Sequence, residues 1–229
     1  MVAAMAAEAR ALRPLRRNAA GLSLRNDGTL VSISGIGGPA ATAGAHALLT
    51  HGATALMSFG MAGGLDPTLR PGRIVLPHRV ITLDGAAYAT ARAWGAGLAA
   101  QVPAGMPPPA HGVLLTTDRA IDGAEAKAAL FRATGAVAVD MESAAIAKVA
   151  AEHGLPFMAV RVIVDAAEDT LPPSVVAASD AGELNLTMLL AGLLRAPAEI
   201  LPLLRLAHRY AAAKRSLTAM AAVLRPAAP

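Results

Sequence analysis

The chain has 229 residues, of which 55% are hydrophobic and only 3% aromatic, and it contains no cysteine. A chain of this length and apolar content can bury a substantial core, so disorder is excluded for most of it. The lack of cysteine excludes disulfide scaffolds, thiolate nucleophiles, iron–sulfur clusters and cysteine-ligated zinc. The net charge is +4, and the excess lies at the C-terminal end, where six basic residues face one acid between Leu190 and Pro229.

No stretch of the sequence is predicted to cross a membrane, because charges and prolines interrupt the most apolar segment, Leu184 to Leu206. The N-terminal stretch lacks a signal-peptide pattern, since its arginines follow the apolar part. We therefore expect a cytoplasmic protein. The basic, apolar C-terminal segment favours a membrane surface or a protein partner over nucleic acid, although an ordinary surface helix explains the pattern equally well.

Apolar, β-rich runs alternate with helical patterns along the chain, which predicts an α/β domain with helices on both faces of a largely parallel sheet. Strands are expected at Thr29–Ile36, Ala53–Phe59, Arg73–Thr82, Gly112–Thr116, Ala136–Val139 and Phe157–Val164. Helices are expected at Ala6–Arg17, Pro39–His51, Ala91–Gln101, Gly123–Ala133, Met141–His153 and Ala181–Leu194, and from about Ala196 to Ala222. We divide the chain into a domain of residues 1–195 and a basic helical extension of residues 196–229.

Two glycine-rich segments, Ser34–Gly38 and Ser58–Gly64, follow predicted strands. Glycine permits tight turns and lets the backbone approach a ligand closely. The first segment is not a Walker A loop, and it matches the dinucleotide-binding fingerprint only loosely because no acid follows at the ribose-binding distance. Taken alone, each segment is also typical of an ordinary turn.

Acidic residues stand at three positions where chemistry is plausible. Asp140 and Glu142 flank a methionine at a strand-to-helix junction, where a carboxylate can cap the helix or accept two hydrogen bonds from a ribose diol. Asp165 directly follows an apolar strand, so partial burial would raise its pKa and allow proton donation; capping of a turn is the alternative. Glu8, isolated among alanines, carries no signal by itself. The six histidines have no metal-ligand spacing, so we expect no metal site and no cofactor.

Taken together, four segments in this order resemble the purine nucleoside phosphorylase/nucleosidase superfamily: Ser34–Gly37, Gly60–Leu65, Asp140–Val149 and Arg161–Asp165. The resemblance covers most of residues 1–195 and is closest in pattern to the methylthioadenosine/S-adenosylhomocysteine nucleosidases. The basic C-terminal extension is similar to that of the hopanoid-biosynthesis branch, whose members remove adenine from adenosylhopane. The resemblance implies a three-layer α/β/α fold with a mixed central sheet, a C-terminal helical extension and a homodimer, at the inner membrane surface if the substrate is a hopanoid.

The resemblance also implies residue roles. Asp165 matches the acid that protonates N7 of the leaving purine, and Glu8 matches the acid that activates water. Glu142 matches the carboxylate that holds the ribose hydroxyls, and Met141 the residue that packs against the sugar. The remaining matches are Ala62 and Gly63 beside the ribose and Ile121, whose backbone contacts the base. The implied reaction is release of adenine from adenosylhopane.

Members of this superfamily use either water or phosphate as the nucleophile. Ser58 stands two positions before Gly60, where many of the phosphorylases carry arginine, and the N-terminal region has no glycine–Asp–Pro loop followed by arginine. These departures favour water. A phosphate-dependent phosphorylase, a soluble methylthioadenosine/S-adenosylhomocysteine-type nucleosidase and a non-catalytic nucleoside- or lipid-binding protein are the alternatives. The segment Asp84–Pro109 does not resemble the nucleosidases closely, so the 5′ substituent stays open.

Overall fold

The computed structural model describes residues 1–18, 21–170, 179–180, 183–184 and 200–224. Its strands are β1 (Val2–Ala3), β2 (Leu15–Arg17), β3 (Ser23–Arg25), β4 (Leu30–Ile33), β5 (Leu56–Gly64), β6 (Ile74–Val75), β7 (Arg79–Thr82), β8 (Ala87–Ala89), β9 (Val113–Thr116), β10 (Ala136–Asp140), β11 (Phe157–Asp165), β12 (Ser179–Asp180) and β13 (Glu183–Leu184). Its helices are α1 (Ala6–Ala9), the 3₁₀ turn η1 (Arg10–Leu12), α2 (Gly38–Thr50), α3 (Arg92–Ala100), α4 (Ala124–Thr134), α5 (Ser143–Glu152) and α8 (Ile200–Val223).

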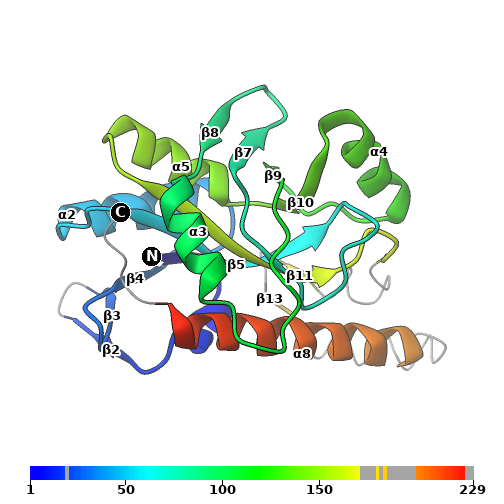
Figure 1. Ribbon diagram of the computed structural model, residues 1–229, viewed down its shortest axis with the longest axis horizontal. Coiled ribbons are helices and arrows are strands. Elements are labelled where there is room, and N and C mark those ends of the chain that lie inside the picture. The colour runs from blue at the N-terminus through cyan, green and yellow to red at the C-terminus, as the bar shows by residue number, and fades with distance from the viewer. Residues whose placement is uncertain (19–20, 171–178, 181–182, 185–199, 225–229) are drawn as a thin grey trace.

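The main sheet is mixed and has β5 at its centre (Figure 1). Strand β5 pairs in parallel with β1 and β11, and its last residues pair antiparallel with β10. Strands β10, β9 and β7 continue the sheet in parallel, whereas β6 adds to β11 in the antiparallel direction. The mixed α/β architecture expected from the sequence is confirmed.

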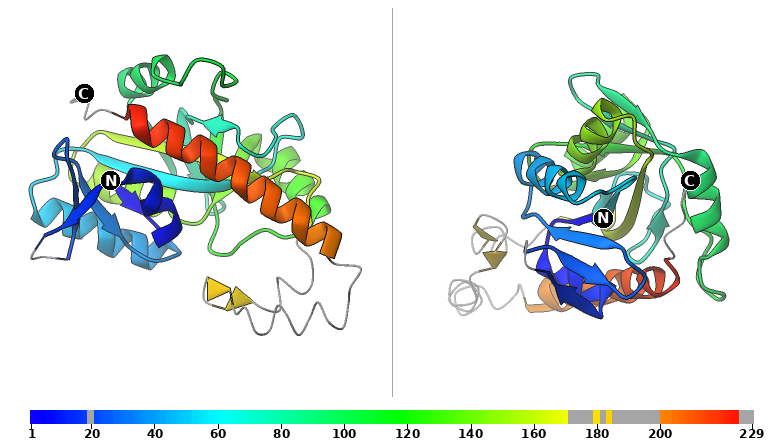
Figure 2. Two further views of the ribbon diagram at one scale, coloured as in Figure 1. Left: turned by 90° about the horizontal axis from the view of Figure 1, so that it is seen from below. Right: turned by 90° about the vertical axis from the view of Figure 1, so that its left-hand side faces the viewer.

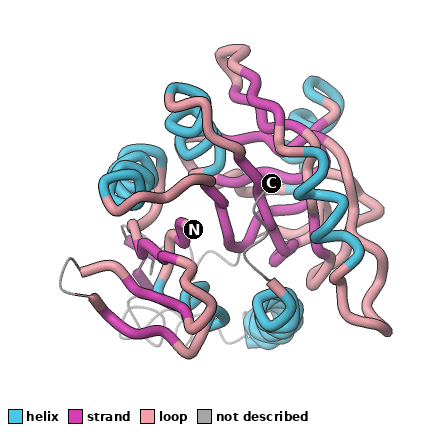
Figure 3. The backbone as a smooth tube through the Cα atoms, turned by 60° about the vertical axis from the view of Figure 1, so that its left-hand side comes forward, coloured by secondary structure: helices cyan, strands magenta, loops and turns pink. Residues whose placement is uncertain are grey.

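Helices cover both faces of the sheet, as Figure 3 shows, and the side chains of β11 demonstrate how. Phe157, Ala159 and Ile163 pack into one buried cluster with α2 and α5. Their neighbours Met158 and Val160 point the other way and pack with α3, η1 and α8. Since successive side chains of a strand point to opposite faces, a strand this apolar on both sides must lie between two helical layers.

Helix α8 is part of this second layer (Figure 2, left). Its residues Ala213, Leu217 and Met220 are fully buried and pack in the same cluster as Met158 and Val160 of β11. The predicted helix is therefore confirmed, and its apolar face stabilises the core. The predicted boundary at residue 195 lies outside the described residues.

The sequence-based boundaries fail in several places. The helix expected at Ala6–Arg17 ends at Leu12, because Pro14 cannot continue it, and Leu15–Arg17 forms a strand of a hairpin instead. The strand expected at Arg73–Thr82 is divided into β6 and β7. Most of the helix expected at Ala181–Leu194 lies outside the described residues, and Glu183–Leu184 within it forms β13.

The prediction for the glycine-rich segment after Phe59 is the most informative of the errors. It was expected to be a loop, yet β5 continues through it to Gly64. Two strands pair with it there: Ile163 of β11 stands opposite Ala62, and Val139 of β10 stands opposite Gly63. The glycines thus allow close approach of neighbouring chains within a sheet rather than a turn.

Candidate active site

A cavity of about 270 Å³ lies where β5, β10 and β11 end beside α1. Its described lining comprises Ala4, Met5, Glu8, Ile36, Met61, Ala62, Gly63, Thr117, Ala120, Ile121, Val139, Asp140, Met141, Glu142, Val164 and Asp165. All seven residues singled out from the sequence are among them, although they come from five separate parts of the chain. The structure thus brings the predicted site residues together, while their roles remain predictions.

An irregularity in strand pairing places Asp165 in the cavity. Strands β5 and β11 pair residue by residue up to Ala62 and Ile163, and the register then shifts so that Gly63 stands opposite Asp165. A shift of this kind redirects a side chain at the end of a strand. A side chain on Gly63 would place its Cβ 3.4 Å from the Asp165 carboxyl and 3.3 Å from Val139. The glycine therefore keeps open the space in front of the acid.

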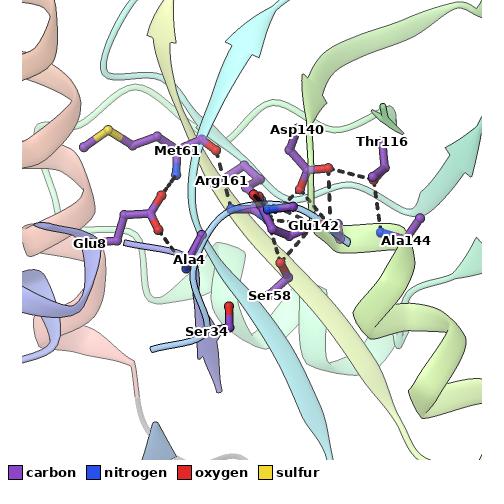
Figure 4. A network of polar contacts seen from close by, with 12 residues as sticks. Ala4, Glu8, Ser34, Ser58, Met61, Thr116, Asp140, Glu142, Ala144 and Arg161 are labelled. Carbon is purple, nitrogen blue, oxygen red and sulfur yellow. Dashed lines mark hydrogen bonds and ion pairs between the residues drawn. The ribbon is translucent and has the colours of Figure 1, made fainter. Parts of the chain in front are cut away.

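Glu8 is held by three backbone N–H groups, of which Figure 4 labels those of Ala4 and Met61. Its Oε2 accepts hydrogen bonds from the N–H groups of Ala4 and Met5, each at 3.0 Å, and its Oε1 accepts one from Met61 at 2.8 Å. The side chain is 2% exposed but borders the cavity. Because its contacts come from both β1–α1 and β5, the fold itself fixes the position of this carboxylate.

The buried side chain of Arg161 supports the part of the cavity wall that Asp140 and Glu142 form. Arg161 lies mid-strand in β11, and its Nη2 is 2.5 Å from Asp140 Oδ2 and 3.6 Å from Glu142 Oε2. Two serine hydroxyls and the Met61 carbonyl accept its other N–H groups. The guanidinium is therefore paired within the protein, and Arg161 does not line the cavity.

Each carboxylate oxygen of Glu142 has its own partner. The backbone N–H of Gly37 donates to Oε1 at 3.0 Å, and Arg161 approaches Oε2. Burial raises the pKa of Glu142, and the positive charge of Arg161 opposes that rise. The glycine segment Ser34–Gly38 thus has a definite role: it brings Gly37, with a φ of 92°, against this acid.

Gly60 lies beside both Glu8 and Arg161. A Cβ at this position would collide with Glu8 Oε1 and would lie 2.5 Å from Arg161 Nη1. Only glycine leaves free the space beside β5 that Glu8 and Arg161 share at this point.

Burial also raises the pKa of Asp165, and the Lys127 ammonium is the main opposing influence. The direction agrees with the expectation for an acid at the end of an apolar strand, and it favours the protonated form that a proton donor needs. Lys127 was not expected in the site, because a lone lysine in an alanine-rich helix carries no sequence signal. The apolar wall formed by Met5, Ile36 and Met61 was likewise not anticipated.

Residues 23–195, more than half of the chain, match the family model of the Phosphorylase superfamily. The chain belongs to this superfamily. It is 34% identical over 155 residues to the 5′-methylthioadenosine/S-adenosylhomocysteine nucleosidase of Baumannia cicadellinicola, an alignment that covers 59% of this chain and 67% of that protein.

Solved structures share the fold of this superfamily member. The 5′-methylthioadenosine/S-adenosylhomocysteine nucleosidase of Helicobacter pylori superimposes with a TM-score of 0.67 at 18% identity, covering 97% of both chains. The futalosine hydrolase of the same organism gives 0.67 at 18% identity, covering 97% of this chain and 96% of that one. A putative nucleosidase of Francisella philomiragia gives 0.69 at 19% identity, with 97% and 96% covered. Methylthioadenosine/S-adenosylhomocysteine nucleosidases and a futalosine hydrolase thus share this architecture, so the fold alone does not identify the substrate.

Proposed function

We propose that this protein hydrolyses the N-glycosidic bond of an adenine nucleoside, with Asp165 as the general acid and Glu8 as the base that activates water. The observation that carries the proposal is the single cavity bordered by both acids and by Glu142. Glu8 lies beside Gly60 and Asp165 beside Gly63, so the two acids border positions about 10 Å apart along β5. The proposal places the sugar and the water molecule between these two acids, in the cavity that both border.

The proposed chemistry uses each acid once. Asp165 donates its proton to N7 of the purine while the bond from C1′ to N9 breaks and its electron pair leaves with the base. Positive charge develops on the ribose, and the nearby carboxylates stabilise it. Water adds to C1′ and gives a proton to Glu8. Glu142 accepts hydrogen bonds from the ribose hydroxyls, and Met141, Ala62 and Gly63 bound the sugar.

The charges around the cavity favour water over phosphate. Among the described lining residues there are four acids and neither lysine nor arginine. Phosphate binding in proteins usually uses arginine, lysine or clustered backbone donors. The nearby cations are already engaged: Lys127 pairs with Asp165, and Arg161 pairs with Asp140 and donates to Ser58, which stands where many phosphorylases carry arginine. A dianion would therefore meet repulsion at this site.

We propose adenosylhopane as the natural substrate, with a methylthioadenosine-type nucleoside as the competing candidate. Both share the adenine and ribose that the cavity residues would bind, so they differ only in the 5′ substituent. The apolar side chains of Met5, Ile36 and Met61 border the cavity, and such a wall suits an apolar substituent. The substituents of both candidates are apolar, so the wall fits either one, and the resemblance to the hopanoid branch is what supports the first candidate.

The outward side of α8 would provide the membrane contact that such a substrate needs. Arg205, Lys214 and Arg215 are exposed on it, while the apolar side is buried in the core. The helix can therefore attract an anionic surface without inserting into it. No helix among the described residues combines the length and apolarity needed to span a bilayer.

The deciding experiment measures adenine release from adenosylhopane in detergent and from methylthioadenosine, each with and without phosphate. Phosphate-independent release from the hopanoid supports the proposal in full. Release only with phosphate would overturn Glu8 as the base, and turnover of methylthioadenosine alone would overturn the hopanoid. Vesicle binding is tested separately: K214E/R215E should weaken binding to anionic vesicles, whereas R79E/R92E, with the same change of charge elsewhere on the surface, should not.

A further inference from the structure

Lys127 is a buried cation that the proposed reaction does not use. It lies on α4, is 2% exposed, and donates hydrogen bonds to three acceptors at the end of β11 and in the turn that follows. These are the Asp165 carboxylate oxygen Oδ2, the Ala166 carbonyl at 2.9 Å and the Asp169 carbonyl at 3.1 Å. All three ammonium protons are therefore engaged, which is what allows a lysine to stay charged when it is buried.

The turn that Lys127 contacts is fixed from two further directions. The Ala166 N–H donates to Asp169 Oδ2 at 2.8 Å, and Arg209 of α8 pairs with Asp169 Oδ1 at 2.7 Å. Lys127 is the cation of this group that touches Asp165 itself. Within the described part of the chain, the other carboxyl oxygen of Asp165 has no hydrogen-bond partner, and the side chain borders the cavity. One oxygen is thus anchored, which leaves the other for a ligand.

We infer that Lys127 is a positioning residue for the acid: it fixes the Asp165 carboxyl by one oxygen and stabilises the carboxylate left after proton transfer. The inference rests on the proposed function for its catalytic meaning. The proton passes from the Asp165 carboxyl to N7, the electron pair of the broken bond leaves with the purine, and the new carboxylate faces the ammonium. Lys127 keeps its own three protons throughout the step.

The expected effect on ionisation follows from the groups around Asp165. Lys127 on α4 and Arg209 on α8 favour the carboxylate, whereas burial and Asp169 oppose it. The region behind Asp165 is also lined by Asp122, Glu168 and Arg205. Removing the lysine charge leaves burial less opposed, so the pKa of Asp165 should rise further and the acid should become weaker.

The test follows the Asp165 carboxyl directly, by ¹³C NMR titration of protein labelled at the aspartate carboxyl carbons, with D165N identifying the signal. K127M should raise the titration midpoint of Asp165 by about one unit or more. K127R, which keeps the charge, should stay close to the unsubstituted protein, and R209M should shift the midpoint less than K127M. An unchanged midpoint in K127M, or an equal shift in R209M, would overturn the inference.

Kinetics supply the second readout. K127M should lower kcat roughly tenfold or more with a smaller change in KM, because a displaced acid affects the transition state most. The alkaline limb of its pH profile should move to higher pH. If K127M does not fold, ¹⁵N NMR of labelled lysines keeps the test open: D165N should shift one solvent-protected ammonium signal, and no change would count against the contact. The two proposals can fail separately. If no nucleoside tested yields adenine, the proposed function fails; if the carboxyl titration of Asp165 still responds to K127M as described, the coupling between Lys127 and Asp165 stands.

Discussion

Glu8 receives its hydrogen bonds from three backbone N–H groups, whereas Asp165 is held by the side-chain ammonium of Lys127. The first arrangement cannot be removed by replacing a neighbouring side chain, since any residue except proline supplies an N–H. The second depends on one lysine. The base end of the cavity is thus fixed by the fold, and the acid end can be tuned by substitution.

Replacing Asp165 should produce the largest effect. D165N keeps the shape of the side chain but removes the proton donor, so kcat for an adenine nucleoside should fall roughly 10²- to 10⁴-fold. Initial-rate measurements of adenine release give this value. A riboside with a 4-nitrophenolate leaving group, which departs without protonation, serves as the control substrate. Its hydrolysis should be nearly unaffected, and an equal loss on both substrates would refute the acid role.

Replacing Glu8 should separate the two ends of the cavity. E8Q should lower kcat by roughly 10²-fold or more on both substrates, because water must be activated whatever the leaving group. The amide also presents its NH₂ group to at least one backbone donor, so a modest loss of stability is expected. Rates on the two substrates, compared with those of D165N, provide the measurement. Selective loss on the adenine nucleoside alone would contradict the assignment.

Arg161 fixes the wall between the two ends, and its loss should appear mainly as lost stability. R161M leaves Asp140 and Glu142 buried near each other without their cation, which should lower the free energy of unfolding by about 3–5 kcal/mol. Urea denaturation measures this loss. S58A, which removes one of the acceptors of Arg161, is the milder control and should cost about 1 kcal/mol. Equal losses in the two variants would show that the ion pairs contribute little.

The raised pKa of Asp165 makes the acid end sensitive to pH in the folded protein. A carboxyl whose folded pKa lies above its unfolded pKa binds protons more tightly when folded, so its contribution is fully present below the unfolded pKa of about 4. That contribution is lost as the pH rises through the folded pKa. The stability of the unsubstituted protein relative to D165N should therefore decrease from pH 4 upward. Paired urea titrations at several pH values test this, and an increase would reverse the assigned direction.

The order of secondary structure could largely be read from the sequence, because apolar, β-rich runs alternate with the segments that form α2, α3, α4 and α5. The boundaries could not be read where partners decide them. The segment after Phe59 has the composition of a loop, yet it forms a strand because β10 and β11 pair with it. Leu15–Arg17 likewise forms a strand only through the hairpin that follows Pro14.

The seven site residues came from the family resemblance, which rests on four motifs, and the structure places them around one cavity. Residues without a motif were missed. Lys127 is one charge among helical alanines, and its importance arises from the distant turn after β11, 38 residues away in sequence. Arg161 begins one of the four segments of the resemblance, but its role could not be read there because its partners lie on β5, β10 and α5. Contacts between distant segments of this kind leave no local pattern in a sequence.

Arg209 should have the smallest effect of the residues that hold the acid end. Its ion pair with Asp169 is 34% exposed on the arginine side, and exposed pairs usually contribute less than about 1 kcal/mol. Lys127 and the Ala166 N–H still hold the turn when Arg209 is replaced. R209M should therefore lower kcat only about two- to fivefold, an effect that raised salt should reproduce in the unsubstituted protein, because screening weakens the same pair. A loss as large as that of K127M would mean that α8, rather than α4, fixes the acid, and would reverse the comparison between a base end built from main chain and an acid end built from one lysine.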